Sequence, residues 1–210
     1  FRDTGLYRSS ILCAKRVIEL SPAETLLDAP PFIGRLAYPT YYRDLVEQNA
    51  ALSDLDPLLV FSTVRQESLF ESFAASYASA RGLMQVIPDT GNLIAAQLGW
   101  PPGYETGDLY KPYVSVRFGT YYLSQQRDRF DGRIDAALAG YNGGPVNADR
   151  WLNAASGDPD PGRARLVAGC GPRLLAHVQL HRAKPHPGAG GQAAAGRPVR
   201  LGAGSLPPAD

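Results

Sequence analysis

Apolar residues recur at helical spacing along most of the chain before residue 153. Alternation of apolar and polar positions, which is typical of a half-buried strand, is nearly absent. The pattern therefore predicts an all-α fold. Helices are expected at residues 7–22, 39–52, 53–70, 88–99, 132–142 and 144–152, and residues 108–130 form either one long helix or two helices joined near Pro112.

The helix expected at residues 53–70 is apolar almost all round, which indicates a central, buried position. Asp56 suits the N-cap and Pro57 the first helical position. Near the end of this helix stands Glu67, in the cluster "RQES". Its carboxylate either pairs on the surface with Arg65 or Arg81, or is held in a site from which water is largely excluded.

Three regions differ in composition. Residues 1–37 are interpreted as the end of an upstream helical region or a linker, and residues 38–153 as the organised body. Residues 154–210 hold ten Gly, eight Pro and no aromatic residue, so they cannot bury enough apolar surface to offset the entropy of ordering. This Gly/Pro-rich C-terminal tail is expected to be disordered.

The formal net charge of +1 gives no support for a nucleic-acid partner. Cys13 and Cys170 form neither a disulfide framework nor a metal site. No apolar run approaches the length needed to span a bilayer, and the first residues, "FRDTGLYRSS", do not have the pattern of a signal peptide. A chain that begins at Phe1 is expected to be a fragment of a longer protein.

Small and polar residues follow Glu67 along the chain, in "FAASYASARGLMQ". Ser76 can form hydrogen bonds with a carboxyl group or a substrate, and Met84 and Gln85 offer an apolar wall with one amide. Tyr141 and Asn142 lie between glycines in "AGYNGGP". Aromatic faces beside small residues suit a groove for sugar rings, although ordinary packing explains most of the 11 tyrosines.

Four segments carry a resemblance to a known family: "DPLLVFSTVRQESLF", "SARGLMQVIPDTG", "DLYKPYVSVRFGTYYLSQQ" and "AALAGYNGGPVNADRW". In order and spacing they resemble the soluble lytic transglycosylase (SLT) family, relatives of goose-type lysozyme. The resemblance implies a lysozyme-like helical domain in which Glu67 is the catalytic acid/base. It also implies that Ser76 contacts either the reacting sugar or the carboxyl group and that Gln85 lines the groove. Tyr141 would lie close to the glutamate, with Asn142 supporting the site.

The activity implied by the resemblance is cleavage of the β-1,4 bond between N-acetylmuramic acid and N-acetylglucosamine in peptidoglycan, with a 1,6-anhydromuramoyl product. Two alternatives stay open: a lysozyme-like hydrolase of the same bond, and a non-catalytic module that binds peptidoglycan. No metal or organic cofactor is implied, and no protein or membrane partner is indicated. The substrate would place the parent protein outside the cytoplasmic membrane.

The chain departs from the family after Trp151, where relatives continue through an "ETR.YV" motif into a closing helix. This chain has no glutamate after Glu105. We hypothesise that the reading frame shifts shortly after Trp151, because a GC-rich gene read out of frame gives a tail of this composition. The missing motif should then be found in another frame of the gene.

Overall fold

The chain has 210 residues, and a computed structural model describes residues 1–22 and 28–155. Within these residues the regular structure is helical, and the only β pairing consists of two isolated bridges, Ala75–Arg81 and Arg81–Val86. The predicted all-α fold is confirmed. In chain order the elements are η1 (Arg2–Thr4), α1 (Tyr7–Glu19), α2 (Pro31–Ala37), α3 (Arg43–Leu52), α4 (Pro57–Ser68), α5 (Pro88–Leu98), η2 (Thr106–Tyr110), α6 (Pro112–Arg129), α7 (Ile134–Gly143) and α8 (Pro145–Ala155), where η marks a 3-10 helix.

Helices α4 and α5 begin where their local signals indicate, although α4 spans Pro57–Ser68 and is shorter at both ends than the helix expected at residues 53–70. The Asp56 carboxylate accepts a hydrogen bond of 2.8 Å from the Leu58 N–H, and Pro57 occupies the first helical position. Helix α5 begins at Pro88 and stops at Gly99, which takes the left-handed conformation with φ 59°. Between residues 108 and 130 the structure contains a 3-10 helix followed by α6, so the alternative of two elements joined near Pro112 is correct.

Two features near the N-terminus differ from the expectation. Helix α3 begins at Arg43 rather than at Pro39, because Tyr42 is left-handed, with φ 57°, and interrupts helical continuity. Helix α2 is not among the helices expected from the sequence, which place only residues 7–22 in a helix before residue 38. Pro31 stands at the first position of α2, where its missing N–H is no disadvantage.

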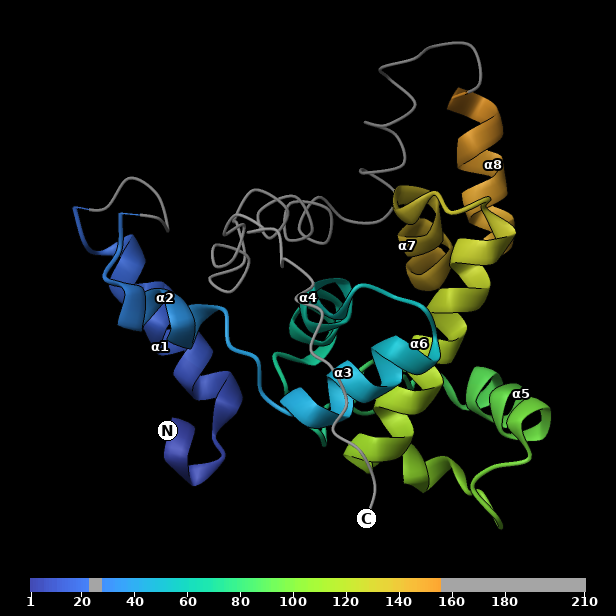
Figure 1. The fold of residues 1–210 in the computed structure, drawn as a ribbon, viewed down its shortest axis with the longest axis horizontal. Helices are drawn as coiled ribbons and strands as arrows, with labels where there is room; N and C mark the ends of the chain where they lie inside the picture. Colours follow the sequence, from blue (N-terminus) through green and yellow to red (C-terminus); the bar gives the residue numbers. More distant parts are fainter. Residues whose placement is uncertain (23–27, 156–210) are drawn as a thin grey trace, which may run out of the picture.

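Helix α4 forms the centre of the core. Its residues Val60 and Val64 are fully buried, and even Ser62, Thr63 and Arg65 are nearly so. Helix α6 packs against α3, α5 and α7, while α7 packs against α8. Figure 1 shows α1 and α2 side by side at one end of the molecule and α7 and α8 at the other, with α3, α4 and α6 between them.

The N-terminal helices are joined to this core by aromatic contacts. Tyr7 of α1 stacks on Tyr41 with 3.9 Å between ring centroids, and Tyr41 meets Phe70 edge-on at 5.4 Å. Ile11 of α1 is fully buried and belongs to the same apolar cluster as residues of α4.

None of the described helices is long and apolar enough to cross a membrane. The C-terminal tail was expected to be disordered, and a frame shift was proposed for it. Residues 156–210 of this tail lie outside the described residues.

Candidate active site

Glu67 lies in the last turn of α4, at the point where the chain leaves the helix. The two residues that follow the end of α4, Leu69 and Phe70, both have left-handed backbone conformations, with φ 52° and 63°. Such conformations are unfavourable for residues other than glycine, so the surrounding packing must hold them. Ser68 supplies part of this support, because its buried hydroxyl lies 2.9 Å from the Leu83 carbonyl oxygen.

The carboxyl group of Glu67 is only partly accessible to solvent, and this burial raises its pKa to about 7. Within the described residues, no ion pair or side-chain hydrogen bond involves Glu67. Arg65 donates instead to the Ala37 carbonyl oxygen at 2.8 Å, and Arg81 donates to Thr106 at 3.1 Å. The surface ion pair is therefore not formed, and the site that holds Glu67 away from water is what the structure shows.

A groove of about 510 Å³ opens beside this carboxyl group. Glu67 is the only carboxyl group among the residues that line the groove. The other lining residues have small, aliphatic, amide, hydroxyl or aromatic side chains. The lining residues are Glu67, Ser76, Ala78, Ala80, Gln85, Val86, Ile87, Thr90, Tyr122, Tyr141, Asn142, Gly143 and Gly144.

One wall of the groove is the loop between α4 and α5, and hydrogen bonds from other elements hold the backbone of Met84 in this loop. The Met84 N–H donates to the Ser115 hydroxyl at 3.1 Å, and the Met84 carbonyl oxygen accepts from the Tyr141 hydroxyl at 2.7 Å. Helices α6 and α7 therefore fix the loop at both polar atoms of one residue.

Gln85 contributes to the same loop from within. Its backbone is left-handed, with φ 50°, and its side-chain amide donates to the carbonyl oxygens of Ala74 at 3.1 Å and Gly82 at 2.9 Å. Because both N–H groups of that amide bind carbonyl oxygens of the loop, the Gln85 side chain stabilises the loop that forms this wall of the groove.

Tyr141 connects the loop with Glu67. Burial raises the pKa of its hydroxyl well above the usual value, and the negative charge of Glu67 adds to this shift. Its ring lies 5.4 Å from that of Tyr122 on α6, measured between centroids. Both tyrosines line the groove and give it aromatic surface.

The structure brings five of the six residues selected from the sequence to one groove: Glu67, Ser76, Gln85, Tyr141 and Asn142. Met84 is the exception. Its side chain is fully buried and does not line the groove, so the apolar wall expected there is wrong for this residue. The side chain packs instead near Gly119 of α6, and Met84 serves the site through its backbone.

Sequence reasoning missed Ile87, Thr90 and Tyr122, which also line the groove. Ile87 and Thr90 lie on either side of Pro88, where α5 begins, and only a few residues after Gln85. This closeness in sequence to a predicted groove residue could have indicated that they line the groove. Tyr122 carried no such signal, because its neighbour Tyr121 has the same chemistry and only the rotation of α6 decides which ring faces the groove. The sequence indicated only that Gly143 is small. In the structure a Cβ atom at this position would lie 2.6 Å from the ring of Trp151, so the packing of that ring requires a glycine here.

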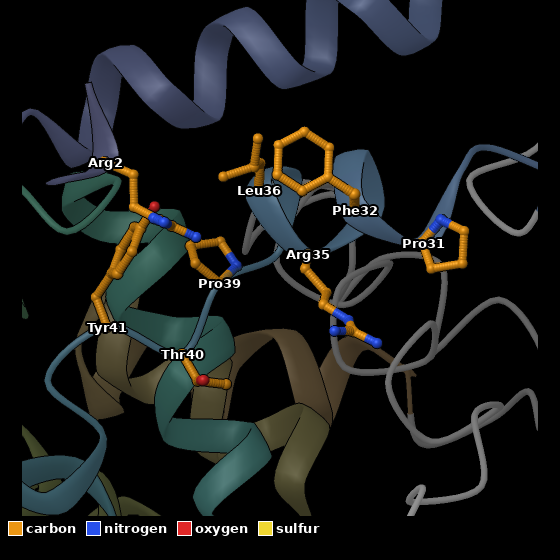
Figure 2. Close-up of a pocket in the computed structure, with 8 residues that line it drawn as sticks. All are labelled: Arg2, Pro31, Phe32, Arg35, Leu36, Pro39, Thr40 and Tyr41. Carbon is orange, nitrogen blue, oxygen red and sulfur yellow. The ribbon is translucent and has the colours of Figure 1, made fainter.

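A second concavity, of about 430 Å³, lies near the N-terminus, and Figure 2 shows its lining residues. Phe32, Arg35 and Leu36 come from α2, and Tyr41 from the segment that follows. No carboxyl group lines this cavity, so it offers no acid for glycan chemistry. Within the described residues no group of three His, Cys, Asp or Glu side chains is placed to hold a metal ion.

Comparison with known proteins bears on this geometry. A family model described as "Transglycosylase SLT domain" matches residues 44–160, which is more than half of the chain. The chain belongs to this family. The matched range contains α4 with Glu67 as well as Tyr141 and Asn142.

Curated relatives of this SLT domain include a putative soluble lytic murein transglycosylase from Haemophilus influenzae, which is 36% identical over 123 residues. That match covers 58% of this chain and 20% of the relative. A membrane-bound lytic murein transglycosylase C from Actinobacillus pleuropneumoniae is 35% identical over 111 residues, covering 49% of this chain and 30% of the relative. The chain thus spans well under half the length of these relatives.

Solved structures agree with the fold. An inactive variant of the lytic transglycosylase Slt from Pseudomonas aeruginosa superposes with a TM-score of 0.62 at 26% identity, covering 85% of this chain and 29% of that one. The 70-kDa soluble lytic transglycosylase in complex with bulgecin A gives a TM-score of 0.64 at 21% identity, covering 85% of this chain and 30% of that one. The lysozyme-like, all-α architecture expected for the SLT domain is confirmed.

Proposed function

We propose that this SLT domain is a lytic transglycosylase that cleaves the β-1,4 bond between N-acetylmuramic acid and N-acetylglucosamine in peptidoglycan and leaves a 1,6-anhydromuramoyl end. The observation that carries the proposal is a single, buried carboxyl group at the wall of a glycan-sized groove. The lytic murein transglycosylases among the relatives support the choice of substrate. Peptidoglycan places the action of the parent protein outside the cytoplasmic membrane.

In the first step Glu67 protonates the oxygen of the glycosidic bond, for which the carboxyl group must be neutral. A pKa of about 7 keeps about half of the molecules in this form at neutral pH. The bond from the sugar carbon C1 to that oxygen then breaks, and the 2-acetamido oxygen of the substrate stabilises the positive charge that develops on C1. In this step the protein contributes the proton of Glu67 and a partly buried environment that keeps this carboxyl group protonated.

In the second step the 6-hydroxyl of the same sugar attacks C1, and Glu67, now ionised, accepts the proton of that hydroxyl. The proton given in the first step is thereby recovered, and no water is consumed. Ordinary glycosidases use two carboxylates, one of them as nucleophile or base for water. A groove whose lining includes one carboxyl group fits the intramolecular route better.

Replacement of Glu67 by glutamine tests the assignment. The amide keeps the size of the side chain but cannot donate or accept the proton, so we expect the rate of cell-wall cleavage to fall by about 10²–10⁴. Glu71→Gln is the matched control, because Glu71 lies in the same region of the chain but does not line the groove. Dye release from purified cell walls measures both. Wild-type rates for Glu67→Gln would contradict the proposal.

Mass spectrometry of the released muropeptides distinguishes the transglycosylase from a hydrolase. An anhydro end is one water lighter than the reducing end that hydrolysis leaves. Reducing ends alone would replace the proposal by a lysozyme-like hydrolase. Binding of cell walls with no cleavage by the unmodified chain would replace it by a peptidoglycan-binding module.

A further inference from the structure

A third cavity, of about 320 Å³, lies at the junction of α3, α5 and α6 and shares no lining residue with the Glu67 groove. Helix α3 supplies one face, at positions i, i+3, i+4 and i+7; the end of α5 and the loop after it supply a second; and the first turns of α6 supply a third. The lining residues are Leu45, Gln48, Asn49, Leu52, Leu98, Trp100, Tyr113 and Arg117. We refer to this cavity as the Trp100 pocket.

Aromatic rings form one side of the Trp100 pocket, and packing fixes the indole of Trp100. This ring meets the fully buried Phe118 at 6.1 Å between centroids, and it meets Tyr113 at 6.1 Å with 65° between the ring planes. Tyr113 is 49% exposed. A rigid indole beside an accessible phenol presents apolar faces with polar edges, a combination that suits the C–H faces and hydroxyl groups of a sugar.

A positive charge without a counterion stands in the same pocket. Within the described residues, no ion pair or hydrogen bond involves the guanidinium of Arg117, and no acidic residue lines the pocket. Arg117 follows Tyr113 by one helical turn of α6, so both side chains face the same side. A half-buried guanidinium in an aromatic pocket favours a ligand that carries a carboxylate.

A buried amide adds a directional contact. Asn49 is only 5% exposed, and one N–H of its amide donates to the Leu45 carbonyl oxygen at 2.8 Å. Within the described residues, its other N–H and its carbonyl oxygen have no partner. The side-chain oxygen of Asn49 is not among the buried atoms left without a partner, so it keeps contact with solvent and can accept a hydrogen bond from a ligand in the pocket.

We propose that the Trp100 pocket is a second glycan-binding site, which takes an amino sugar carrying a carboxylate. Trp100 and Tyr113 would contact the sugar ring, Arg117 the carboxylate, and Asn49 an acetamido or hydroxyl group. Its choice of ligand rests on the proposed function, because N-acetylmuramic acid that carries no stem peptide is the acidic sugar of that substrate. A second strand bound here would hold the enzyme on the cell wall while the Glu67 groove cleaves the first.

Tryptophan fluorescence tests this site directly. The chain has two tryptophans, Trp100 and Trp151, so Trp151→Phe leaves Trp100 as the single reporter. Glu67→Gln is added to prevent cleavage. The probe is the disaccharide of N-acetylglucosamine and N-acetylmuramic acid with a free lactyl carboxylate, and the neutral N-acetylglucosamine dimer serves for comparison. We expect a saturable change in Trp100 emission with either probe, and the acidic probe should reach half-saturation at the lower concentration. The affinity for the acidic probe should fall as the salt concentration is raised.

In the same background Arg117→Gln should weaken binding of the acidic probe about tenfold and remove the preference for it over the neutral one. The matched control is Arg8→Gln, which removes an exposed arginine of α1 that lines neither site. Tyr113→Leu is the second variant, since Tyr113 is half exposed and its loss leaves the core intact; it should weaken both probes. Circular dichroism establishes that each variant is folded.

Equal affinity for the two probes, an unchanged affinity in Arg117→Gln, or no change in Trp100 emission would overturn the proposal. These outcomes are distinguishable from failure of the proposed function, because the measurement requires no cleavage. A chain that cleaves cell walls but shows no response at Trp100 lacks the second site only. A chain that binds the acidic probe at Trp100 but cleaves nothing keeps the second site and loses the assignment of Glu67.

Discussion

The pKa of Glu67 couples the proposed reaction to pH. Because burial raises it to about 7, the proton donor is lost as the pH rises through that value. We therefore expect kcat/KM for cell-wall cleavage to fall above pH 7, by up to about tenfold per pH unit. Glu71→Gln should retain the same alkaline limb. A rate that stays level from pH 7 to pH 9 would contradict the role of Glu67 as the acid.

The same pKa shift changes stability in a defined direction. Between the ordinary value of 4.5 and about 7, the folded chain binds more protons at Glu67 than the unfolded chain does, so the free energy of unfolding falls as pH rises through this interval. Glu67→Gln removes the effect. The variant should gain about 2–3 kcal/mol over wild type at pH 8 and little at pH 4, measured by urea unfolding. An equal difference at both pH values would show that the carboxyl group is not buried.

Tyr141 has a structural role that can be separated from its place in the groove. Tyr141→Phe leaves the Met84 carbonyl oxygen without its donor, and we expect a loss of about 1–3 kcal/mol in the free energy of unfolding. Tyr122→Phe is the control, since within the described residues the Tyr122 hydroxyl has no hydrogen-bond partner. Thermal unfolding compares the two. Equal effects of both substitutions would mean that the bond to Met84 contributes nothing.

Among the elements, the loop from residue 69 to residue 87 has the least regular structure and the most demanding packing. Gly82 is left-handed, with φ 75°, and a Cβ atom there would collide with the Leu109 carbonyl oxygen and lie 2.8 Å from the Ser115 hydroxyl oxygen. We expect Gly82→Ala to destabilise the protein by more than about 3 kcal/mol or to prevent folding. Expression yield and urea unfolding measure the effect.

Gly99 is the matched control for Gly82. It is also left-handed, with φ 59°, but a Cβ atom there meets nothing within 4 Å. Gly99→Ala should therefore show only the backbone cost, about 1–2 kcal/mol. If the two substitutions were equally harmful, close packing around Gly82 would not be the cause.

Elements with strong local signals could be predicted, and those set by tertiary contacts could not. Asp56 and Pro57 fix the start of α4, and Pro88 and Gly99 bound α5, because caps and φ preferences act within a few residues. The left-handed Tyr42 is maintained by packing and leaves no trace in the sequence. For the same reason the sequence could place Glu67 near a site but could not tell that Met84 points into the core while Tyr122 faces the groove.

At the scale of the whole molecule, aromatic contacts connect α1 through Tyr41 to Phe70, which lies just after the helix that carries Glu67. Tyr7→Ala removes the ring that stacks on Tyr41, and we expect a loss of about 1–3 kcal/mol in the free energy of unfolding. Leu12→Ala is the control, because Leu12 lies on the same helix and is 45% exposed; it should stay within about 0.5 kcal/mol. A Tyr7 variant as stable as wild type would show that α1 and α2 do not support the body.

Gln85 gives the groove a fixed polarity. Its two amide hydrogens are already bound to the carbonyl oxygens of Ala74 and Gly82, so toward a guest this side chain can act only as an acceptor. Hydroxyl and acetamide N–H groups of a sugar can satisfy it, whereas a guest that presents only ether or carbonyl oxygens there would be repelled. At this position the groove therefore selects ligands that donate a hydrogen bond to the Gln85 side-chain oxygen.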